Sequence, residues 1–277
     1  MTKWKSFLTR AITAIIALSV LIGLYVYLNV EGLKISVWLA VAIGSWELVG
    51  ILFGNEKSWL LKALFYILCV VVFYATINSL AFGALAYSLA LILFVIFVLL
   101  TQNRAGELAH MMEEHGKASL GLLYMGLLPA FSYKILEQSS GISWFVFLLA
   151  VVFAGDTMAY VFGMLMGKHK VMPAVSPKKT WEGSIGGIIG SVVAGLFCWI
   201  FAFPEMGLIP LLVLSAIAGF VGQFGDFFES LLKRVADVKD SGKIMPGHGG
   251  VLDRIDGVLF ASPVILAGIL TLSHLLS

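Results

Sequence analysis

The sequence predicts an all-α, polytopic integral membrane protein, and three observations lead to that fold class. Apolar residues make up 60% of the 277-residue chain, charged residues only 12%, and the mean hydropathy is +1.00. Several apolar runs reach the roughly 20 residues with which a helix crosses a bilayer. The basic residues are concentrated in short segments between those runs. A soluble domain carries roughly 25% charged residues, so this composition argues against a soluble fold.

We expect about nine membrane-spanning helices. The first follows a basic N-terminal segment, and its apolar run is longer than that of a signal peptide, so we interpret it as a retained span. Residues 59–101 form one apolar block broken only by Asn78 and Ser79, which indicates two helices joined by a tight turn, since one helix of ~40 residues would be far longer than a bilayer is thick. The expected spans are 11–29, 35–53, 59–77, 80–101, 119–137, 143–166, 184–203, 207–232 and 254–276.

The basic residues predict the orientation. With the N-terminus in the cytoplasm, all but two of the 18 Lys and Arg residues lie on the cytoplasmic side, the exceptions being Lys34 and Lys134. The positive-inside rule favours this arrangement, which puts the C-terminus outside. We divide the chain into N-terminal transmembrane helices, 1–101, and C-terminal helices with the cytoplasmic-face loops, 102–277, within one membrane unit. The three sizeable cytoplasmic loops are 102–118, 167–183 and 233–253.

Three acidic residues stand out inside expected spans, where an ionisable group is costly and usually functional. They are Glu47 in the second span, Asp156 in the sixth and Asp226 in the eighth. The alternative is a neutral or paired carboxyl that holds helices together, and we favour that interpretation for Glu47. Asp226 carries the strongest functional signal, because Ser230 and Lys233 follow it on one helical face at spacings of four and three.

The seventh span carries a face of small residues. Gly183, Gly187 and Ser191 recur at a spacing of four, as do Gly186 and Gly190. Such a face allows two membrane helices to approach closely, so we expect tight packing here without a catalytic role.

The second cytoplasmic loop, 167–183, is rich in lysine and ends in the run SPKKTWEG. Ser176, Lys178, Lys179 and Thr180 combine hydroxyl and ammonium groups, and Thr180 is placed to be the N-cap of the following helix. This pattern favours an anionic ligand. The alternatives are a polybasic patch for lipid headgroups or a charge pattern that only sets topology.

The stretch 230–256 is the most polar part of the chain and lies between two apolar runs. Basic side chains suit phosphate, and spaced aspartates suit a hard cation such as Mg²⁺. Asp253 and Asp256 lie three residues apart at the start of the ninth span, so we expect one or the other to approach Asp226 and share a cation with it at the membrane surface. Gly249 and Gly250 let the backbone approach a ligand, and the helix start that follows offers N–H groups to an anion. The segment contains Lys233, Arg234, Lys239, Asp240, Lys243, His248, Asp253, Arg254 and Asp256.

This charged stretch resembles the signature of the phosphatidate cytidylyltransferases, also called CDP-diacylglycerol synthases. The matching pattern is Ser230-x-x-Lys233-Arg234-x4-Lys239-Asp240 followed by His248-Gly249-Gly250-x-x-Asp253-Arg254-x-Asp256. The runs GQFGD and SPKKTWEG, and Gly155-Asp156 with Tyr160 and Gly163, also resemble the family, so the likeness covers about 155–256. Met245 stands where the family more often has Leu, Ile or Phe, which is a volume-conserving departure. The sequence contains no Walker A motif and no GxGxxG.

The resemblance implies a Mg²⁺-dependent nucleotidyltransferase of phospholipid biosynthesis that converts CTP and phosphatidate into CDP-diacylglycerol and pyrophosphate. On this hypothesis Asp226, Asp253 and Asp256 are metal ligands, a second cation is possible, and Asp156 supports them. Lys233 joins the three aspartates as a catalytic residue, and His248 either hydrogen-bonds a phosphate or donates a proton. The expected substrate-binding residues are Ser176, Lys178, Lys179, Thr180, Arg234, Lys239, Asp240, Gly249, Gly250 and Arg254.

The expected surroundings follow from the same hypothesis. The site would face the cytoplasm from a bacterial inner membrane, and the acyl chains would enter sideways between spans. We expect a homodimer and no nucleic-acid partner. Other interpretations stay open at this point: a CTP-dependent lipid kinase that releases CDP, an ion-coupled transporter that uses Asp156 and Asp226, or an inactive scaffold.

Overall fold

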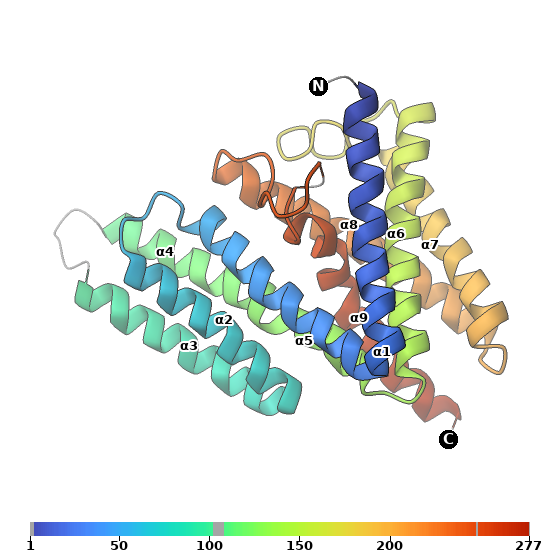
Figure 1. Ribbon diagram of the computed structural model, residues 1–277, viewed down its shortest axis with the longest axis horizontal. Coiled ribbons are helices and arrows are strands. Elements are labelled where there is room, and N and C mark those ends of the chain that lie inside the picture. Colours follow the sequence, from blue (N-terminus) through green and yellow to red (C-terminus); the bar gives the residue numbers. More distant parts are fainter. Residues whose placement is uncertain (1–2, 102–107, 248, 277) are drawn as a thin grey trace. The chain divides into compact units, whose positions relative to one another are not determined.

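The structure is a computed structural model that describes residues 3–101, 108–247 and 249–276. Within these residues the chain forms helices (Figure 1). Two isolated β-bridges, Lys170–Thr180 and Met245–Gly249, occur in the loops. Eight helices of the described part are long and apolar enough to cross a membrane. The predicted all-α, polytopic membrane fold is therefore confirmed.

The helices follow the expected order along the chain. They are α1 (Lys3–Leu52), α2 (Trp59–Asn78), α3 (Leu80–Thr101), α4 (Leu108–Gly121), the π-helical segment η1 (Leu122–Leu127), α5 (Leu128–Leu136), α6 (Gly141–Met166), α7 (Trp181–Ala202), α8 (Leu208–Val235) and α9 (Leu252–Leu276). The break at Asn78 and Ser79 is confirmed, because α2 ends at Asn78 and Ser79 is extended.

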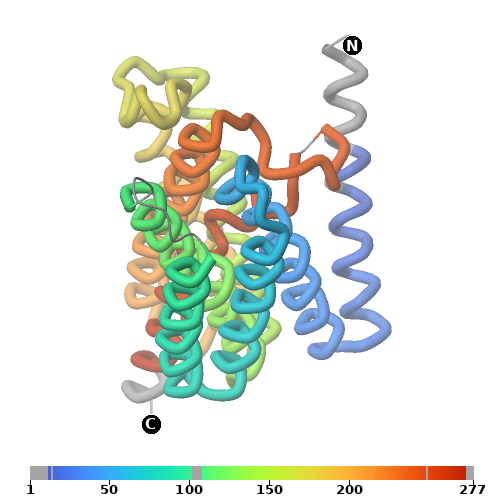
Figure 2. Tube along the Cα trace, turned by 90° about the vertical axis from the view of Figure 1, so that its left-hand side faces the viewer, coloured from blue at the N-terminus to red at the C-terminus, as the bar shows by residue number. Residues whose placement is uncertain are grey.

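The first two expected spans, 11–29 and 35–53, correspond to α1, which ends one residue earlier, at Leu52. Asn29 interrupts this helix with φ 53° and ψ −136°, and the chain reverses there, so that the helix has two arms (Figure 2). Asn is one of the few residues that adopt positive φ readily. Gly32 lies against the backbone of Leu24, where a Cβ atom would collide. The count of nine spans and the sides of the two termini stay predictions.

Part of the expected loop 102–118 is helical, which corrects the sequence analysis. α4 begins at Leu108, and Met111, Glu114 and Ala118 are buried on one face of it. The buried residues are hard to recognise in the sequence because most of the run HMMEEHGK is polar. The spacing of three and four between Met111, Glu114 and Ala118 matches a helix that packs on one side only.

The chain divides into two compact units. Unit 1 comprises Met1–Tyr133 and Ala236–Asp253, and unit 2 comprises Lys134–Val235 and Arg254–Ser277. The expected division at residue 101 stays a prediction. In unit 1 the rings of Phe53 and Phe65 meet edge to face with centroids 5.1 Å apart, a favourable geometry for aromatic pairs.

The small residues of α7 pack closely against neighbouring helices of unit 2, and the predicted tight packing is confirmed. Gly187 and Ser191 are buried, and the Ser191 hydroxyl donates to the Val151 carbonyl of α6 at 2.9 Å. Gln223 of α8 donates from Nε2 to the Ser184 carbonyl at 3.0 Å. Close approach of α6, α7 and α8 fixes the positions of the acidic residues that α6 and α8 carry.

Candidate functional site

The sequence-predicted residues occur in both units, and each group has its own surroundings. Unit 2 contains Asp156, Ser176, Lys178, Lys179, Thr180, Asp226, Lys233, Arg234, Arg254 and Asp256. Unit 1 contains Lys239, Asp240, Gly249, Gly250 and Asp253. His248 lies outside the described residues.

Four acidic residues of unit 2, which we call the carboxylate cluster, come from three helices. Asp156 lies on α6, Asp226 and Glu229 lie on α8, and Asp256 lies on the second turn of α9. Asp226, Glu229 and Asp156 all lie within electrostatic range of Asp256. Asp256 and Glu229 are buried, whereas Asp156 is exposed and the side chain of Asp226 is 35% exposed. The cluster thus combines two accessible carboxylates with two buried ones.

Lys179 connects the second basic loop with this cluster. Its Nζ atom lies 2.5 Å from Oδ2 of Asp226 and 4.2 Å from the centroid of the Phe227 ring, which adds a cation–π contact. The Ser230 hydroxyl donates to Oδ1 of the same aspartate at 3.3 Å. Arg254 also lies within electrostatic range of Asp156. Cations therefore face the accessible side of the cluster.

Lys233 is paired within α8. Its Nζ atom donates to Oε2 of Glu229 at 2.5 Å, and the two side chains are 14% and 1% exposed. Glu229 was not among the predicted site residues, although a Glu four residues before a Lys on one helical face is a recognisable pairing signal. Its buried charge explains how the lysine is held in the last turn of α8 with little exposure.

The loop 167–180 is held in place by the ends of two helices. Thr180 is the N-cap of α7, because its hydroxyl accepts from the Gly183 N–H at 3.2 Å, and this part of the prediction is confirmed. Its role in substrate binding stays a prediction. Glu182, which sequence analysis also missed, accepts from the backbone N–H of Lys168 at 3.0 Å, and its Oε1 lies 2.6 Å from Nδ1 of His169. An acidic residue in the first turn of a helix is a signal that could have found it.

The other side of this loop is tied to α8. Arg234 donates from Nε to the Val175 carbonyl at 3.3 Å. Ser176 is half-buried, Lys178 is exposed, and Lys179 points to Asp226. The loop therefore presents one lysine to its surroundings and another to the carboxylate cluster.

In unit 1, Asp253 braces the charged loop against the start of α9. Its Oδ2 atom accepts from the Ser241 N–H at 2.9 Å, from the Ser241 hydroxyl at 2.9 Å and from the Gly250 N–H at 2.8 Å. Gly249 adopts φ +83°, a conformation that favours glycine, and its carbonyl accepts from Met245 N–H at 3.0 Å. Lys239 and Asp240 are exposed on the same loop. The metal-binding role of Asp253 stays a prediction.

Glu47 of α1 is buried and accepts hydrogen bonds from backbone N–H groups at the start of α9. Its carboxylate accepts from the Val251 N–H at 3.1 Å, the Leu252 N–H at 2.9 Å and the Ser241 hydroxyl at 3.2 Å. The first N–H groups of a helix have no partner within the helix and carry partial positive charge, so a carboxylate stabilises them. The interpretation of Glu47 as a carboxyl that holds helices together is confirmed.

A further group of possible metal ligands was not predicted. Among the described residues of unit 1, Glu56, His110 and Glu114 bring one donor atom each to within 4.8 Å of one another. Nε2 of His110 lies 3.4 Å from Oε1 of Glu114 and 3.7 Å from Oε2 of Glu56. The backbone N–H of Ser58 donates to Glu56 at 3.0 Å and lowers the pKa of that carboxyl. The spacing of four between His110 and Glu114 is the signal available in the sequence.

Fold and site together define a helical membrane protein in which carboxylates, lysines and an arginine are gathered in one unit. The chain belongs to the cytidylyltransferase family, which matches residues 8–272. The resemblance found in the charged segment is thereby confirmed.

Curated relatives agree with this assignment. The phosphatidate cytidylyltransferase of Staphylococcus saprophyticus is 44% identical over 146 residues, which are 53% of this chain and 55% of that protein. Proteins of the same name from Staphylococcus epidermidis and Staphylococcus aureus are 42% and 41% identical over the same length. The chain thus spans about half the length of the curated relatives it matches.

Proposed function

We propose that this protein is a nucleotidyltransferase that transfers CMP from CTP to phosphatidate and forms CDP-diacylglycerol and pyrophosphate for phospholipid biosynthesis. The observation that carries the proposal is the contact between Lys179 and Asp226. It joins a basic loop suited to anionic substrates with carboxylates suited to a divalent cation, at the end of membrane-spanning helices. Family membership and the names of the relatives support the same reaction.

The reaction requires two anions to meet. A phosphate oxygen of phosphatidate attacks the α-phosphorus of CTP and forms a new P–O bond. The bond from that phosphorus to the oxygen bridging to the β-phosphate breaks, and pyrophosphate leaves with the electron pair. Lys178, Lys179 and Arg254 would reduce the repulsion between the reactants and hold their phosphates in line.

We take the carboxylate cluster as the site of a Mg²⁺ ion because of its donor chemistry; among the described residues no three of its carboxylates bring donor atoms to within 4.8 Å of one another, so substrate phosphates would have to complete the ligand set. Asp156, Asp226 and Asp256 supply oxygen donors from three helices, and Mg²⁺ prefers a few carboxylates shared with substrate phosphates. When bound, the ion would neutralise phosphate charge. A second cation is possible, because the cluster has more carboxylate oxygens than one Mg²⁺ usually takes from a protein. Lys233, which we predict to be catalytic, would balance the charge of the buried Glu229 within the cluster.

The proposal includes a location and partners. CTP, phosphatidate and the bilayer are the partners, and we keep the homodimer and the lack of a nucleic-acid partner as predictions. The bacterial origin of the relatives supports a bacterial inner membrane, and the basic loops support an active site at its cytoplasmic face.

Product analysis tests the proposal. Protein purified into lipid nanodiscs is incubated with CTP and phosphatidate, with Mg²⁺ or with EDTA. Formation of CDP-diacylglycerol and pyrophosphate in equal amounts, with Mg²⁺ only, is the expected result. Release of CDP with a phosphorylated lipid would identify a lipid kinase, and ion flux in liposomes without CTP would identify a transporter. Either result overturns the proposal.

A further inference from the structure

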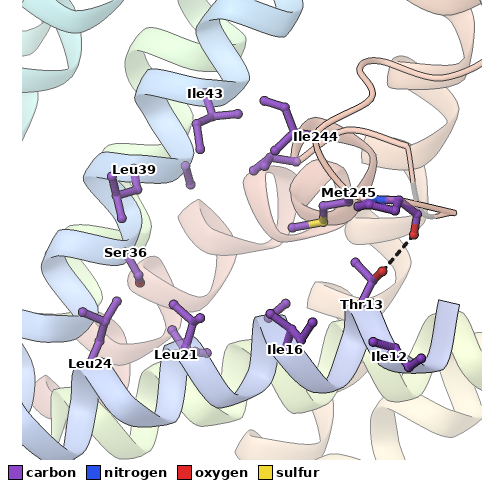
Figure 3. Close-up of a pocket in the computed structure, with 15 residues that line it drawn as sticks. Ile12, Thr13, Ile16, Leu21, Leu24, Ser36, Leu39, Ile43, Ile244 and Met245 are labelled. Atoms are coloured by element: carbon purple, nitrogen blue, oxygen red, sulfur yellow. Dashed lines mark hydrogen bonds between the residues drawn. The ribbon is translucent and has the colours of Figure 1, made fainter. Parts of the chain in front are cut away.

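An apolar cavity of about 560 Å³ lies in unit 1, outside the carboxylate cluster. Its walls are the two arms of α1, and the loop segment Ile244–Pro246 with Val251 closes one side (Figure 3). Ile16 and Leu21 line it from the first arm and Leu39 from the second. The volume is that of a small-molecule site.

The two hydroxyl groups of the lining are engaged with the backbone. Thr13 donates to the Pro246 carbonyl at 2.8 Å (dashed in Figure 3), and Ser36 donates to the Leu33 carbonyl at 2.6 Å. The remaining lining residues are apolar apart from backbone groups. The cavity therefore offers a ligand hydrocarbon contacts and little hydrogen bonding.

The exposed side of α1 indicates that a ligand would come from the membrane. The two arms of α1 form a candidate membrane span, Ile15–Leu52. Ile15 and Leu18 on the first arm are exposed and do not line the cavity. A helix that exposes apolar side chains in this way is surrounded by lipid hydrocarbon. The flexible apolar group in that phase is an acyl chain.

The loop that closes the cavity adds charge. Lys243 directly precedes Ile244 and is exposed, and Lys239 is exposed on the same loop. A lipid whose chain occupies the cavity would have its headgroup beside these lysines, and a basic rim favours an anionic headgroup. We propose that the cavity between the arms of α1 binds an acyl chain of the phosphatidate substrate. This inference rests on the proposed function and locates the lipid tail.

Hydrocarbon inside the cavity gains little over hydrocarbon in the bilayer, so selectivity comes from shape and from the headgroup. Filling the cavity should then affect long-chain substrates most. Leu21→Trp places a large ring in the cavity, and Leu18→Trp makes the same change on the outward side of the same arm. We expect Leu21→Trp to lower kcat/KM for dioleoyl phosphatidate about tenfold. Dioctanoyl phosphatidate and the KM for CTP should be unaffected in both variants.

Photo-crosslinking tests occupancy without turnover. Benzoylphenylalanine is placed at Leu21 or at Leu18, in vesicles of phosphatidylcholine with a minor fraction of phosphatidate. We expect Leu21 to capture phosphatidate well above its fraction in the vesicle and Leu18 to capture both lipids in proportion. Proportional capture at both positions, with normal turnover of the unmodified protein, overturns the inference and leaves the proposed function intact. Selective capture by a protein that makes no CDP-diacylglycerol supports the lipid site and overturns the proposed function.

Discussion

The two units use buried and accessible carboxylates in opposite ways. In unit 1, Glu47 and Asp253 accept hydrogen bonds from backbone N–H groups and the Ser241 hydroxyl, and so hold the charged loop to the start of α9. In unit 2, Asp156 and Asp226 are accessible and face the cations Lys179 and Arg254. Glu47 and Asp253 thus shape the charged loop, whereas Asp156 and Asp226 are open to an approaching cation; the metal-binding role of Asp253 stays a prediction.

The largest effect is expected at Asp226. Asp226→Asn removes an accessible charge while keeping the shape of the side chain, so we expect CDP-diacylglycerol formation to fall by at least about 10³-fold. Size-exclusion profile and helix content should stay unchanged. Asp237→Asn, on an exposed loop position with φ 52°, is the control and should keep full activity. Comparable activity in both variants would remove Asp226 from the proposed site.

Substitution of Glu47 should lower the free energy of unfolding more than it lowers the reaction rate. Glu47→Ala leaves the N–H groups of Val251 and Leu252 without their acceptor, and we expect a loss of about 3 kcal/mol in the free energy of unfolding. Unfolding in mixed detergent micelles, followed by tryptophan fluorescence, measures it. Glu31→Gln changes an exposed glutamate of the same helix and should cost little. An unchanged midpoint for Glu47→Ala would show that the loop is held by other contacts.

The neighbouring lysines of the second loop give a matched pair. Lys179 contacts Asp226 whereas Lys178 is exposed, so Lys179→Gln should lower kcat/KM about tenfold and Lys178→Gln only a few-fold. Steady-state kinetics with varied CTP and varied phosphatidate separate the two substrates. Equal losses would mean that the loop acts as a general basic surface.

The smallest effect is expected at the cap of α7. Thr180→Ala removes the acceptor of the Gly183 N–H and should cost about 1 kcal/mol of stability. Thr180→Ser keeps the hydroxyl and should restore most of the loss, as read from the thermal midpoint. A drop in activity that Ser also fails to restore would indicate a substrate contact through the threonine methyl group.

Much of the fold could be predicted because its signals are local. The apolar runs give the membrane helices, Asn78 and Ser79 mark the turn between α2 and α3, and the recurring small residues of α7 predict its close packing. The helical part of the expected loop 102–118 was missed, because its buried face is hidden among polar residues that pack only in the folded unit.

The site was predictable only in part, for a physical reason. The charged residues of 230–256 stand out by composition, but their partners come from elsewhere in the chain. Glu47 and Ser241 are 194 residues apart, and no periodicity relates them. Glu229 and Glu182 had local signals, a helical pairing distance and a first-turn position. Those signals indicate that a charge is tolerated at each position, but they do not identify the group that the charge binds.

The link between Glu47 and α9 has a consequence for biosynthesis. The carboxylate leaves the ribosome 205 residues before the Leu252 amide that it will bind. Until that amide is made, the nascent chain carries an acidic group in an apolar segment, which disfavours stable insertion by a few kcal/mol. Glu47 therefore obtains its backbone partners only once the start of α9 has been synthesised.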